Sequence, residues 1–388
     1  MFDLTPAHAE LVRNVTELAE EEFADETLSW RGDPPWENIQ RLAEEGYYCL
    51  NIDDEYGGGG QTEFEAMLVV EAVGHVDPDT AIFLSPQQMI SPRALDMFGT
   101  EAAKEKYLPP VIDGEEAMSI AMSEPDAGSD LRAMNTTAES DGDGYVINGE
   151  KTWVGFVKWA SAAVVWTKVP DGIGSMIVDL DDPGVEIVNH YTNMAGHTQT
   201  HFRMNDVIVP AENVLTEGQE GFRQQLEALN WERLSAAVGS NVIAAKAYEF
   251  AAEFAGEREA SGKPIREHQA VGHKLAEMAK KITASRVLSF QCAAAANRND
   301  RYLNPLGVTM AKLYSSQILE EVVTAALQIH GARGYQQGHP VEYLYRLARG
   351  RRIAGGTDEV LKNTMVSMLD DEDLPSTVSV AHQQSRGN

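Results

Sequence analysis

One short segment of the chain combines residue types suited to acid–base chemistry. Trp231-Glu232-Arg233 places a carboxylate between a large aromatic side chain and a guanidinium. A carboxylate enclosed in an apolar pocket has a raised pKa and can remove a proton near neutral pH. The residues alone leave open a plainer alternative, in which Glu232 lies on a helix surface and pairs with a nearby arginine.

A second segment leaves an apolar strand and enters a loop of small polar residues. It runs from Ala121 to Asp130 and reads Ala-Met-Ser-Glu-Pro-Asp-Ala-Gly-Ser-Asp. Such a loop can present backbone N–H groups and hydroxyls to a polar ring or a phosphate. A tight surface turn explains this stretch equally well on its own. The Gly57–Gly60 run lacks the strand-then-helix context of a phosphate loop and is interpreted as a turn or hinge.

The composition limits the class of protein. The 388 residues suffice for two or three domains, and the 43% apolar content favours a folded chain. Sixty acidic residues against 31 basic ones give a net charge of −29, which repels nucleic acid and anionic membrane surfaces. An acidic chain with more arginine than lysine is also what a salt-rich cytoplasm favours, so we hypothesise a salt-adapted source.

The cysteines and histidines predict neither disulfides nor a metal site. Cys49 and Cys292 lie in apolar surroundings and are interpreted as packing residues. His197 and His201 are four apart in a β-rich stretch, so they do not share one face as metal ligands on a helix would. No stretch approaches the length of a membrane span, and the N-terminus lacks a signal pattern. We therefore expect a cytoplasmic protein.

The elements that must position these residues fall into three parts. Residues 1–116 are predicted to form an all-α domain, in which Thr5-Pro6 resembles a helix N-terminus. Residues 117–219 alternate β-branched and aromatic residues with turn residues and predict a β domain, with Asn148-Gly149 as a hairpin turn. Residues 220–374 are rich in alanine and predict a helical bundle, followed by a polar tail over 375–388.

Individual elements are also predicted. Helical runs are expected around Ile39–Gly46, Glu63–Val76 and Ala94–Phe98, and over 220–256, 266–298, 305–330 and 357–370. Strands are expected at Tyr145–Gly149, Ala163–Thr167, Ser175–Val178 and Phe202–Val209.

The loop segment from Ala121 to Asp130 closely resembles the signature of the acyl-CoA dehydrogenase family. Further segments resemble the family in the same order, namely Tyr145–Trp153, Val207–Pro210, Glu232-Arg233, Gln328–Tyr335 and Gly356–Glu359. The resemblance spans nearly the whole chain with matching spacing. It implies an α+β multi-domain fold with an N-terminal helical domain, a middle β-barrel or sandwich domain and a C-terminal four-helix bundle.

The resemblance also implies FAD, bound where the β domain meets the C-terminal bundle. Residues expected to bind FAD within the subunit are Ile120, Met122, Ser123, Ser129, Trp153, Gly155, Thr357 and Glu359. Residues expected to reach the FAD of a neighbouring subunit are Arg258, Gln269, Gln328, Gly331 and Ala332. A shared cofactor implies at least a dimer, and commonly a homotetramer in this family.

The resemblance further implies α,β-dehydrogenation of an acyl-CoA, with electron-transfer flavoprotein as the electron acceptor. The family usually carries its catalytic glutamate directly before Gly-Thr, where this chain has Gly355. Glu232 matches the alternative position used by long-chain and isovaleryl-CoA dehydrogenases. Glu232 is thus the expected base, and the backbone N–H at Gly355 remains a donor for the enolate oxygen.

Substrate contacts and departures from the family pattern complete the prediction. Asn230, Arg233, Gly355 and Gly356 are expected to bind the thioester end of the substrate, and Ser129 the pantetheine of CoA. Ala236 and Gly239 follow Glu232 on one helix face, and they either leave room for an acyl chain or serve tight helix packing. The family's Arg-x-x-Phe-Gly and Arg-Asp-Ala-Arg motifs are altered here, and the loop over 192–203 is short. The altered segments read Arg258-Glu259-Ala260-Ser261-Gly262 and Arg346-Leu347-Ala348-Arg349, and Gly155 replaces a hydroxyl residue.

Two other functions remain open at this point. One is a flavin oxidase or monooxygenase of the same fold that acts on a substrate without CoA. The other is a non-catalytic FAD-binding relative. DNA-binding relatives carry a basic C-terminal extension, whereas this chain is acidic and ends soon after the Gly-Thr motif.

Overall fold

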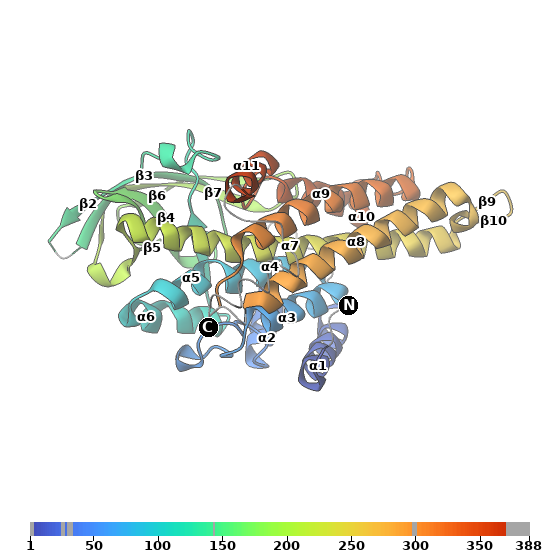
Figure 1. Ribbon diagram of the computed structural model, residues 1–388, viewed down its shortest axis with the longest axis horizontal. Coiled ribbons are helices and arrows are strands. Elements are labelled where there is room, and N and C mark those ends of the chain that lie inside the picture. The colour runs from blue at the N-terminus through green and yellow to red at the C-terminus, as the bar shows by residue number, and fades with distance from the viewer. Residues whose placement is uncertain (1–3, 25–27, 29–33, 143, 297–300, 370–388) are drawn as a thin grey trace.

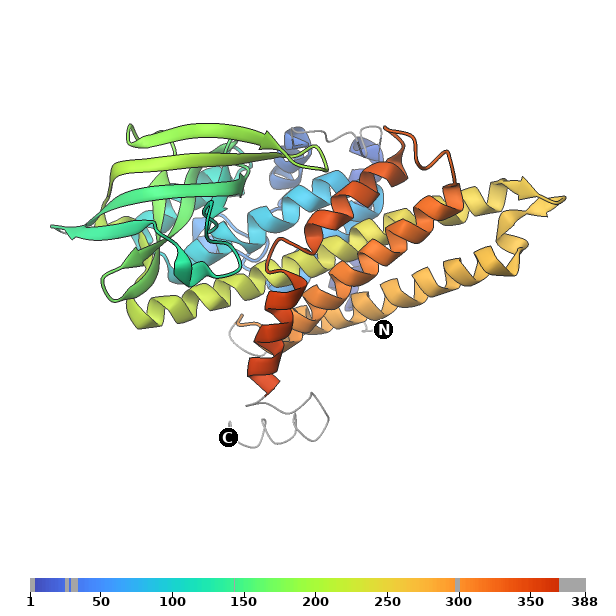
Figure 2. The ribbon, with the colours of Figure 1, turned by 90° about the horizontal axis from the view of Figure 1, so that it is seen from above.

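A computed structural model describes residues 4–24, 28, 34–142, 144–296 and 301–369. One long helix, α7 (Gly218–Glu257), runs through the middle of the molecule. The β-sheet packs at one end of it and the N-terminal helices lie along one side. The other C-terminal helices extend toward the far end, except for the last one, which lies near the middle (Figures 1 and 2). This arrangement matches the predicted fold class.

The N-terminal part is entirely helical among its described residues. Its helices are α1 (Pro6–Glu22), α2 (Trp36–Glu44), α3 (Glu63–Val76), α4 (Pro78–Met89), α5 (Ser91–Phe98) and α6 (Glu101–Ile112). Local sequence sets their starts: Thr5 and Thr62 form capping boxes, and the Asp77 side chain accepts from two N–H groups of α4. Helices α3 and α4 are buried on most sides because they pack against each other and against α7.

The middle part is one mixed sheet. Its strands are β1 (Ala117–Ala121), β2 (Thr137–Asp141), β3 (Gly144–Gly155), β4 (Ala160–Val169), β5 (Gly172–Asp179), β6 (Val185–Thr192), β7 (Thr198–Val209) and β8 (Val214–Thr216). They are ordered β6-β7-β3-β2-β4-β5-β8, and β1 pairs in parallel with β4. The loop that follows β1 therefore begins inside the sheet, and this fixes the direction in which Met122 and Ser123 leave it.

The predicted hairpin at Asn148-Gly149 is wrong. Both residues lie inside β3, which pairs with β2 on one side and β7 on the other, and the β7 register shifts between Ile147 and Gly149. A Cβ on Gly149 would lie 2.5 Å from Thr136 Oγ1, so glycine is needed here for close approach of two strands rather than for a turn. Asn148 uses its amide to bond the Asp206 carboxylate and backbone of β7.

The C-terminal part is a bundle around α7. It contains α8 (Gln269–Ala296), α9 (Pro305–His330), α10 (Pro340–Arg351), α11 (Asp358–Leu369) and a small hairpin of β9 (Glu259–Ala260) and β10 (Lys263–Pro264). Single 3-10 turns also occur at Asp54–Tyr56, Leu131–Ala133, Ala211–Asn213 and Ile265–Glu267. Fully buried alanines of α7, including Ala237, Ala244 and Ala251, allow α9 to approach closely. The predicted long helices are confirmed, whereas α10 was not predicted.

Two smaller expectations concern burial and membranes. Cys49 and Cys292 are buried and unpaired, as expected of packing residues. Among the described residues, no helix is both long enough and apolar enough to cross a membrane. The predicted domain limits stay a prediction, although β1 begins at Ala117 and α7 at Gly218.

Candidate active site

The structure brings Glu232 and Gly355 together, although 123 positions separate them. Glu232 lies in the first half of α7, and Gly355 lies in the loop between α10 and α11. A Cβ on Gly355 would lie 3.5 Å from Glu232 Oε1. The Glu232 carboxylate therefore lies directly beside the place that a side chain at position 355 would begin to fill. Gly355 has φ +67°, a conformation that glycine adopts without strain.

Glu232 has the environment of a carboxyl group with a raised pKa. Its Oε2 atom is buried and has no hydrogen-bond partner among the described residues. Burial raises the pKa of Glu232, while the positive charges of Lys312 and Arg233 oppose that rise. A surface glutamate paired with arginine does not describe this residue, because no ion pair to Glu232 forms within the described chain.

Lys312 is a residue of this site that the sequence analysis missed. It lies fully buried on α9, and its Nζ donates to the Gly356 carbonyl at 2.6 Å. Burial lowers the pKa of Lys312 to about 8, although Glu232 favours its charged form. The helical periodicity of the sequence could have predicted that Lys312 is buried. Lys312 follows Val308 by four residues and precedes Leu319 by seven, so it lies on the buried face of its helix.

Arg233 and Asn230 connect α7 with α9. The Arg233 guanidinium donates to Asn230 Oδ1 at 3.1 Å and to Thr309 Oγ1 at 3.2 Å, and all three residues are buried. Arg233 Nε is buried without a partner in the described chain. Both residues lie beside the base, but their predicted contact with the thioester stays a prediction.

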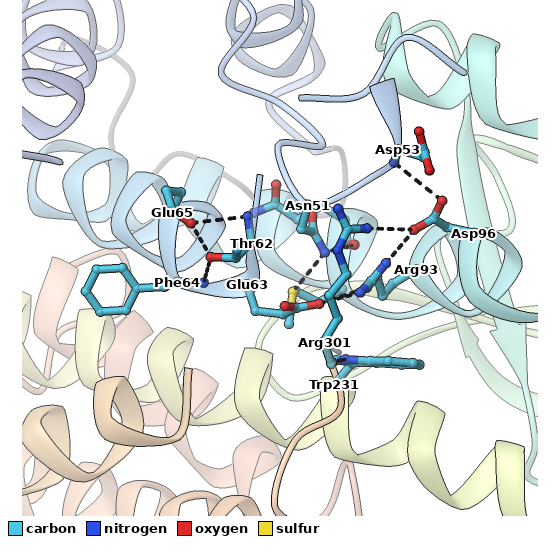
Figure 3. A network of polar contacts seen from close by, with 12 residues as sticks. Asn51, Asp53, Thr62, Glu63, Phe64, Glu65, Arg93, Asp96, Trp231 and Arg301 are labelled. Carbon is cyan, nitrogen blue, oxygen red and sulfur yellow. Dashed lines mark hydrogen bonds and ion pairs between the residues drawn. The ribbon is translucent and has the colours of Figure 1, made fainter. Parts of the chain in front are cut away.

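Trp231 anchors the base to the N-terminal helices. The Arg93 guanidinium lies 5.1 Å from the Trp231 ring centre and is fully buried. Arg93 forms ion pairs with Glu63, at 2.7 Å, and with Asp96 (Figure 3). The Trp231 indole N–H donates to the Arg301 carbonyl at 3.3 Å. This network joins α3, α5 and α7, and it holds fixed the residue directly before Glu232.

The loop after β1 is tied to β3 at the predicted flavin position. Thr152 N–H donates to the Ser123 carbonyl at 2.9 Å, and Lys151 Nζ donates to the Met122 carbonyl at 3.1 Å. Lys151 also pairs with the buried Glu124 at 2.8 Å. Burial lowers the pKa of Lys151 to about 8, although Glu124 favours its charged form. Of the residues predicted here, Ile120, Met122 and Ser123 are half-buried and Ser129 is exposed.

The end of β3 offers an exposed aromatic face next to open space. The Trp153 side chain is 54% exposed, has φ +61° and lies 5.1 Å from the Tyr191 ring. A Cβ on Gly155 would meet no atom within 4 Å, and the Gly155 carbonyl accepts from the Ser119 hydroxyl. A strained, exposed tryptophan beside open space fits a planar ring system such as isoalloxazine.

The remaining predicted residues of the same subunit begin α11. Thr357 Oγ1 accepts from Val360 N–H at 3.3 Å, and Glu359 is exposed. Between them, Asp358 is buried and is held by Arg352 at 2.5 Å. The loop that carries Gly355 and Gly356 is thus fixed on both sides, by Lys312 and by Asp358.

A second group of predicted residues lies at the far end of the bundle. Arg258 ends α7 at a distance of 26 residues from Glu232, or about 39 Å along the helix. The other members of this group are Gln269 at the start of α8 and Gln328, Gly331 and Ala332 at the end of α9, and all are exposed. These residues cannot join Glu232 within one chain, and this separation agrees with their predicted role toward a neighbouring subunit.

The residues of the altered motifs make other local contacts in this structure. Ser261 has φ +54° and forms the turn of the β9–β10 hairpin. Arg346, which lacks the family's acidic neighbour, pairs instead with Glu342 one turn earlier and donates to the Met194 carbonyl at 2.8 Å. That second bond ties the short loop between β6 and β7 to α10.

Comparisons with known proteins identify the family of this chain. Profiles described as "Acyl-CoA dehydrogenase" N-terminal, middle and C-terminal domain match residues 5–115, 119–207 and 219–369. The caffeyl-CoA reductase–Etf complex subunit CarC of Acetobacterium woodii is 33% identical, over 91% of this chain and 95% of its own length. The glutaryl-CoA dehydrogenase of Desulfococcus multivorans is 31% identical, over 92% and 94%.

The fold is shared with solved structures as well. Butyryl-CoA dehydrogenase from Megasphaera elsdenii superposes with a TM-score of 0.86 at 28% identity, covering 95% of this chain and 99% of the other. The chain therefore belongs to the acyl-CoA dehydrogenase family, whose members are oxidoreductases with FAD as their cofactor.

Proposed function

We propose that this protein oxidises an acyl-CoA thioester to a trans-2-enoyl-CoA, with Glu232 as the base that removes the α proton. The single observation that carries the proposal is the Glu232 carboxylate beside Gly355, with an unpartnered buried oxygen. A base needs a free oxygen aimed at its substrate and a pKa raised toward the working pH, and burial supplies that rise.

The loop at Gly355 supplies the second requirement of proton removal. An enolate oxygen needs donors that are already oriented when negative charge develops. The N–H groups of Gly355 and Gly356 bond no described acceptor, and Lys312 holds the loop through the Gly356 carbonyl. We assign the Gly355 N–H as the oxyanion donor, with Asn230, Arg233, Gly356 and Ser129 near the CoA thioester.

FAD supplies the acceptor for the hydride that leaves the β carbon. The residues proposed to hold it are those of the β1 loop and of the end of β3, together with Thr357 and Glu359. We assign Arg258, Gln269, Gln328, Gly331 and Ala332 to the FAD of a second subunit in a homotetramer. We also propose electron-transfer flavoprotein as the electron acceptor, since a relative at 33% identity is named as an Etf complex subunit.

The reverse reaction is a second candidate. Relatives named caffeyl-CoA reductase and acryloyl-CoA reductase are 33% and 32% identical to this chain. In that direction the protonated form of Glu232, which burial favours by raising its pKa, would donate the proton to the α carbon. Rates measured with an oxidising dye and a saturated acyl-CoA, against a reduced dye and an enoyl-CoA, decide which direction dominates.

The proposal is tested by titrating the purified FAD-containing protein with acyl-CoAs of graded length in the absence of oxygen. Glu232→Gln removes the base but keeps the size of the side chain, so we expect bleaching of the flavin absorbance to fall by about 10³-fold or more in rate while FAD stays bound. Glu253→Gln, an exposed glutamate on the same helix, is the matched control and should bleach at the normal rate.

Three results would contradict parts of the proposal. Normal bleaching of the Glu232→Gln protein would remove Glu232 from the role of base. Oxygen consumption with a substrate that lacks CoA would favour the oxidase or monooxygenase alternative. Bound FAD that no CoA ester reduces or reoxidises, together with a lack of any oxidase activity, would indicate a non-catalytic relative.

A further inference from the structure

Arg351 is a half-buried guanidinium for which the proposed reaction has no use. It is the last residue of α10, and its side chain turns inward against α7. A Cβ on Gly239 would lie 3.7 Å from both Nη1 and Nη2 and 3.9 Å from the central carbon, so the Nη side of the guanidinium lies against the helix. No hydrogen bond or ion pair to Arg351 occurs within the described part of the chain.

The groups nearest to Arg351 are already engaged with one another. His197 Nε2 and the Tyr343 hydroxyl lie 2.9 Å apart, and Tyr343 donates to Asp79 Oδ1 at 3.0 Å. Burial lowers the pKa of Arg351 to about 10, although the nearby Tyr343 opposes that fall. Arg351 is half-buried, and a guanidinium that is partly withdrawn from water and lacks a carboxylate can bind an anionic ligand group that supplies the acceptor.

Arg351 lies at the end of a row of small residues that begins at the base. Glu232, Ala236 and Gly239 lie on one face of α7, because four and seven residues bring a helix back to the same side. Between residues 231 and 244, only Glu232 and Ala236 keep intermediate exposure, while every other residue of the stretch is buried. The sequence left open whether these small side chains serve an acyl chain or helix packing, and this pattern of exposure favours the acyl chain.

The length of this row gives the length of the acyl group. Seven residues separate Glu232 from Gly239, which is about 10 Å along the helix axis. A hydrogen bond to the guanidinium takes up about 3 Å of that span. The remaining distance of about 7 Å corresponds to about six bonds, since an extended chain advances roughly 1.2 Å per bond. Counted to the carboxylate oxygen that accepts the hydrogen bond, six bonds beyond the α carbon is a seven-carbon acyl group, which at this precision means about seven to eight carbons.

We infer that Arg351 is a specificity-determining residue that binds a carboxylate at the far end of the acyl chain, so that the substrate class is a dicarboxylyl-CoA of about eight carbons. The inference rests on the proposed function, since it places the α carbon beside Glu232. A guanidinium binds a carboxylate through two parallel hydrogen bonds, and such charge-assisted bonds are strongest where water is excluded.

The test compares two CoA esters that differ only at the far end, octanedioyl-CoA and octanoyl-CoA, with the FAD-containing protein. We expect kcat/KM to be at least about tenfold higher for octanedioyl-CoA. Arg351→Met should lower that value by about tenfold or more, mostly through KM, and leave octanoyl-CoA unchanged or improved. Arg349→Met is the matched control, because Arg349 lies on the same helix, is half exposed and faces Glu320 at 3.9 Å.

The possible outcomes distinguish a failure of this inference from a failure of the proposed function on which it rests. Turnover of octanoyl-CoA that equals or exceeds that of octanedioyl-CoA would overturn the dicarboxylyl substrate, and this comparison needs no variant. Equal losses on both esters in Arg351→Met would assign Arg351 a structural role and overturn its role in specificity. If no CoA ester of either kind reduces the flavin, the proposed function fails and the inference fails with it.

Discussion

At the scale of single residues, Lys312 sets the proton affinity of Glu232. Its positive charge opposes the rise that burial imposes on the pKa of Glu232. Lys312→Met keeps much of the buried volume but removes that charge, so the pKa of Glu232 should rise further. We expect the acidic limb of the kcat/KM profile, where the base gains its proton, to move toward higher pH by about 1 pH unit. The pH dependence of kcat/KM measures this directly.

The sign of this effect depends on Lys312 being charged in the range examined. Its pKa of about 8 means that it carries a proton below that pH and favours the carboxylate there. Lys281→Met is the control, because Lys281 is partly exposed and pairs with Glu321 on α9. A profile that stays in place in Lys312→Met, with only kcat reduced, would restrict Lys312 to holding the Gly356 loop.

The sequence predicted Glu232 as the base but did not indicate the charges around it. The sequence analysis considered Glu232 and Gly355 together because the family resemblance assigned a catalytic role to both positions. The resemblance assigned no role to Lys312 or Arg351. Arg351 also belongs to the segment Arg349-Gly350-Arg351-Arg352, whose composition is typical of a solvated helix end. Only the packing of α10 against α7 shows that Arg351 turns inward while Arg349 turns outward. The direction of a side chain near a helix end depends on tertiary contacts that local periodicity does not encode.

At the scale of elements, the close approach of β2 and β3 depends on Gly149. The residue has φ +149°, and a Cβ there would meet three atoms of Thr136 at 2.5 to 2.7 Å. Gly149→Ala should therefore lower the free energy of unfolding by about 2 kcal/mol or more, because β3 must move away from Thr136, the residue directly before β2. Thermal unfolding monitored by circular dichroism measures the loss.

A glycine elsewhere in the chain provides the comparison. Gly350 lies in α10 with a helical backbone, and a Cβ there would meet nothing within 4 Å. Gly350→Ala should leave stability unchanged or raise it by up to about 1 kcal/mol, since alanine favours the helix. Equal stabilities for Gly149→Ala and the wild-type protein would show that the strands can shift to admit a methyl group.

The wrong prediction of a hairpin at Asn148-Gly149 has its origin in strand pairing as well. Asn-Gly indicates a turn only when the chain reverses after it, and the residues after Gly149 continue the strand through Trp153 to Gly155. Helices were predicted more accurately than strands because their buried faces recur along a single segment. The partners of β3 come from β2 and β7, and strand pairing over such separations is not visible in local sequence.

At the scale of the whole molecule, the three-part order of helices, sheet and helices was readable from the change in periodicity. The long helix predicted over 220–256 is α7, and its two ends carry residues that were predicted to serve different sites. The N-terminal half of α7 carries Glu232, and its C-terminal end carries Arg258 about 39 Å away. The resemblance assigned Arg258 to a neighbouring subunit, and the length of this helix gives the physical reason for that assignment.

Net charge is a property of the whole molecule and leads to the last prediction. The chain carries −29, so its carboxylates repel one another in the folded state more than in the expanded unfolded state. Added salt screens that repulsion over about 10 Å at 0.1 M and over about 3 Å at 1 M. We therefore expect the unfolding temperature of the FAD-containing protein to rise from low salt to molar KCl, as a salt-adapted protein requires. The same titration at mildly acidic pH is the control, since carboxylates that have become neutral leave less repulsion for salt to screen. An unfolding temperature indifferent to KCl at neutral pH would refute salt adaptation and leave the charge with a role in solubility alone.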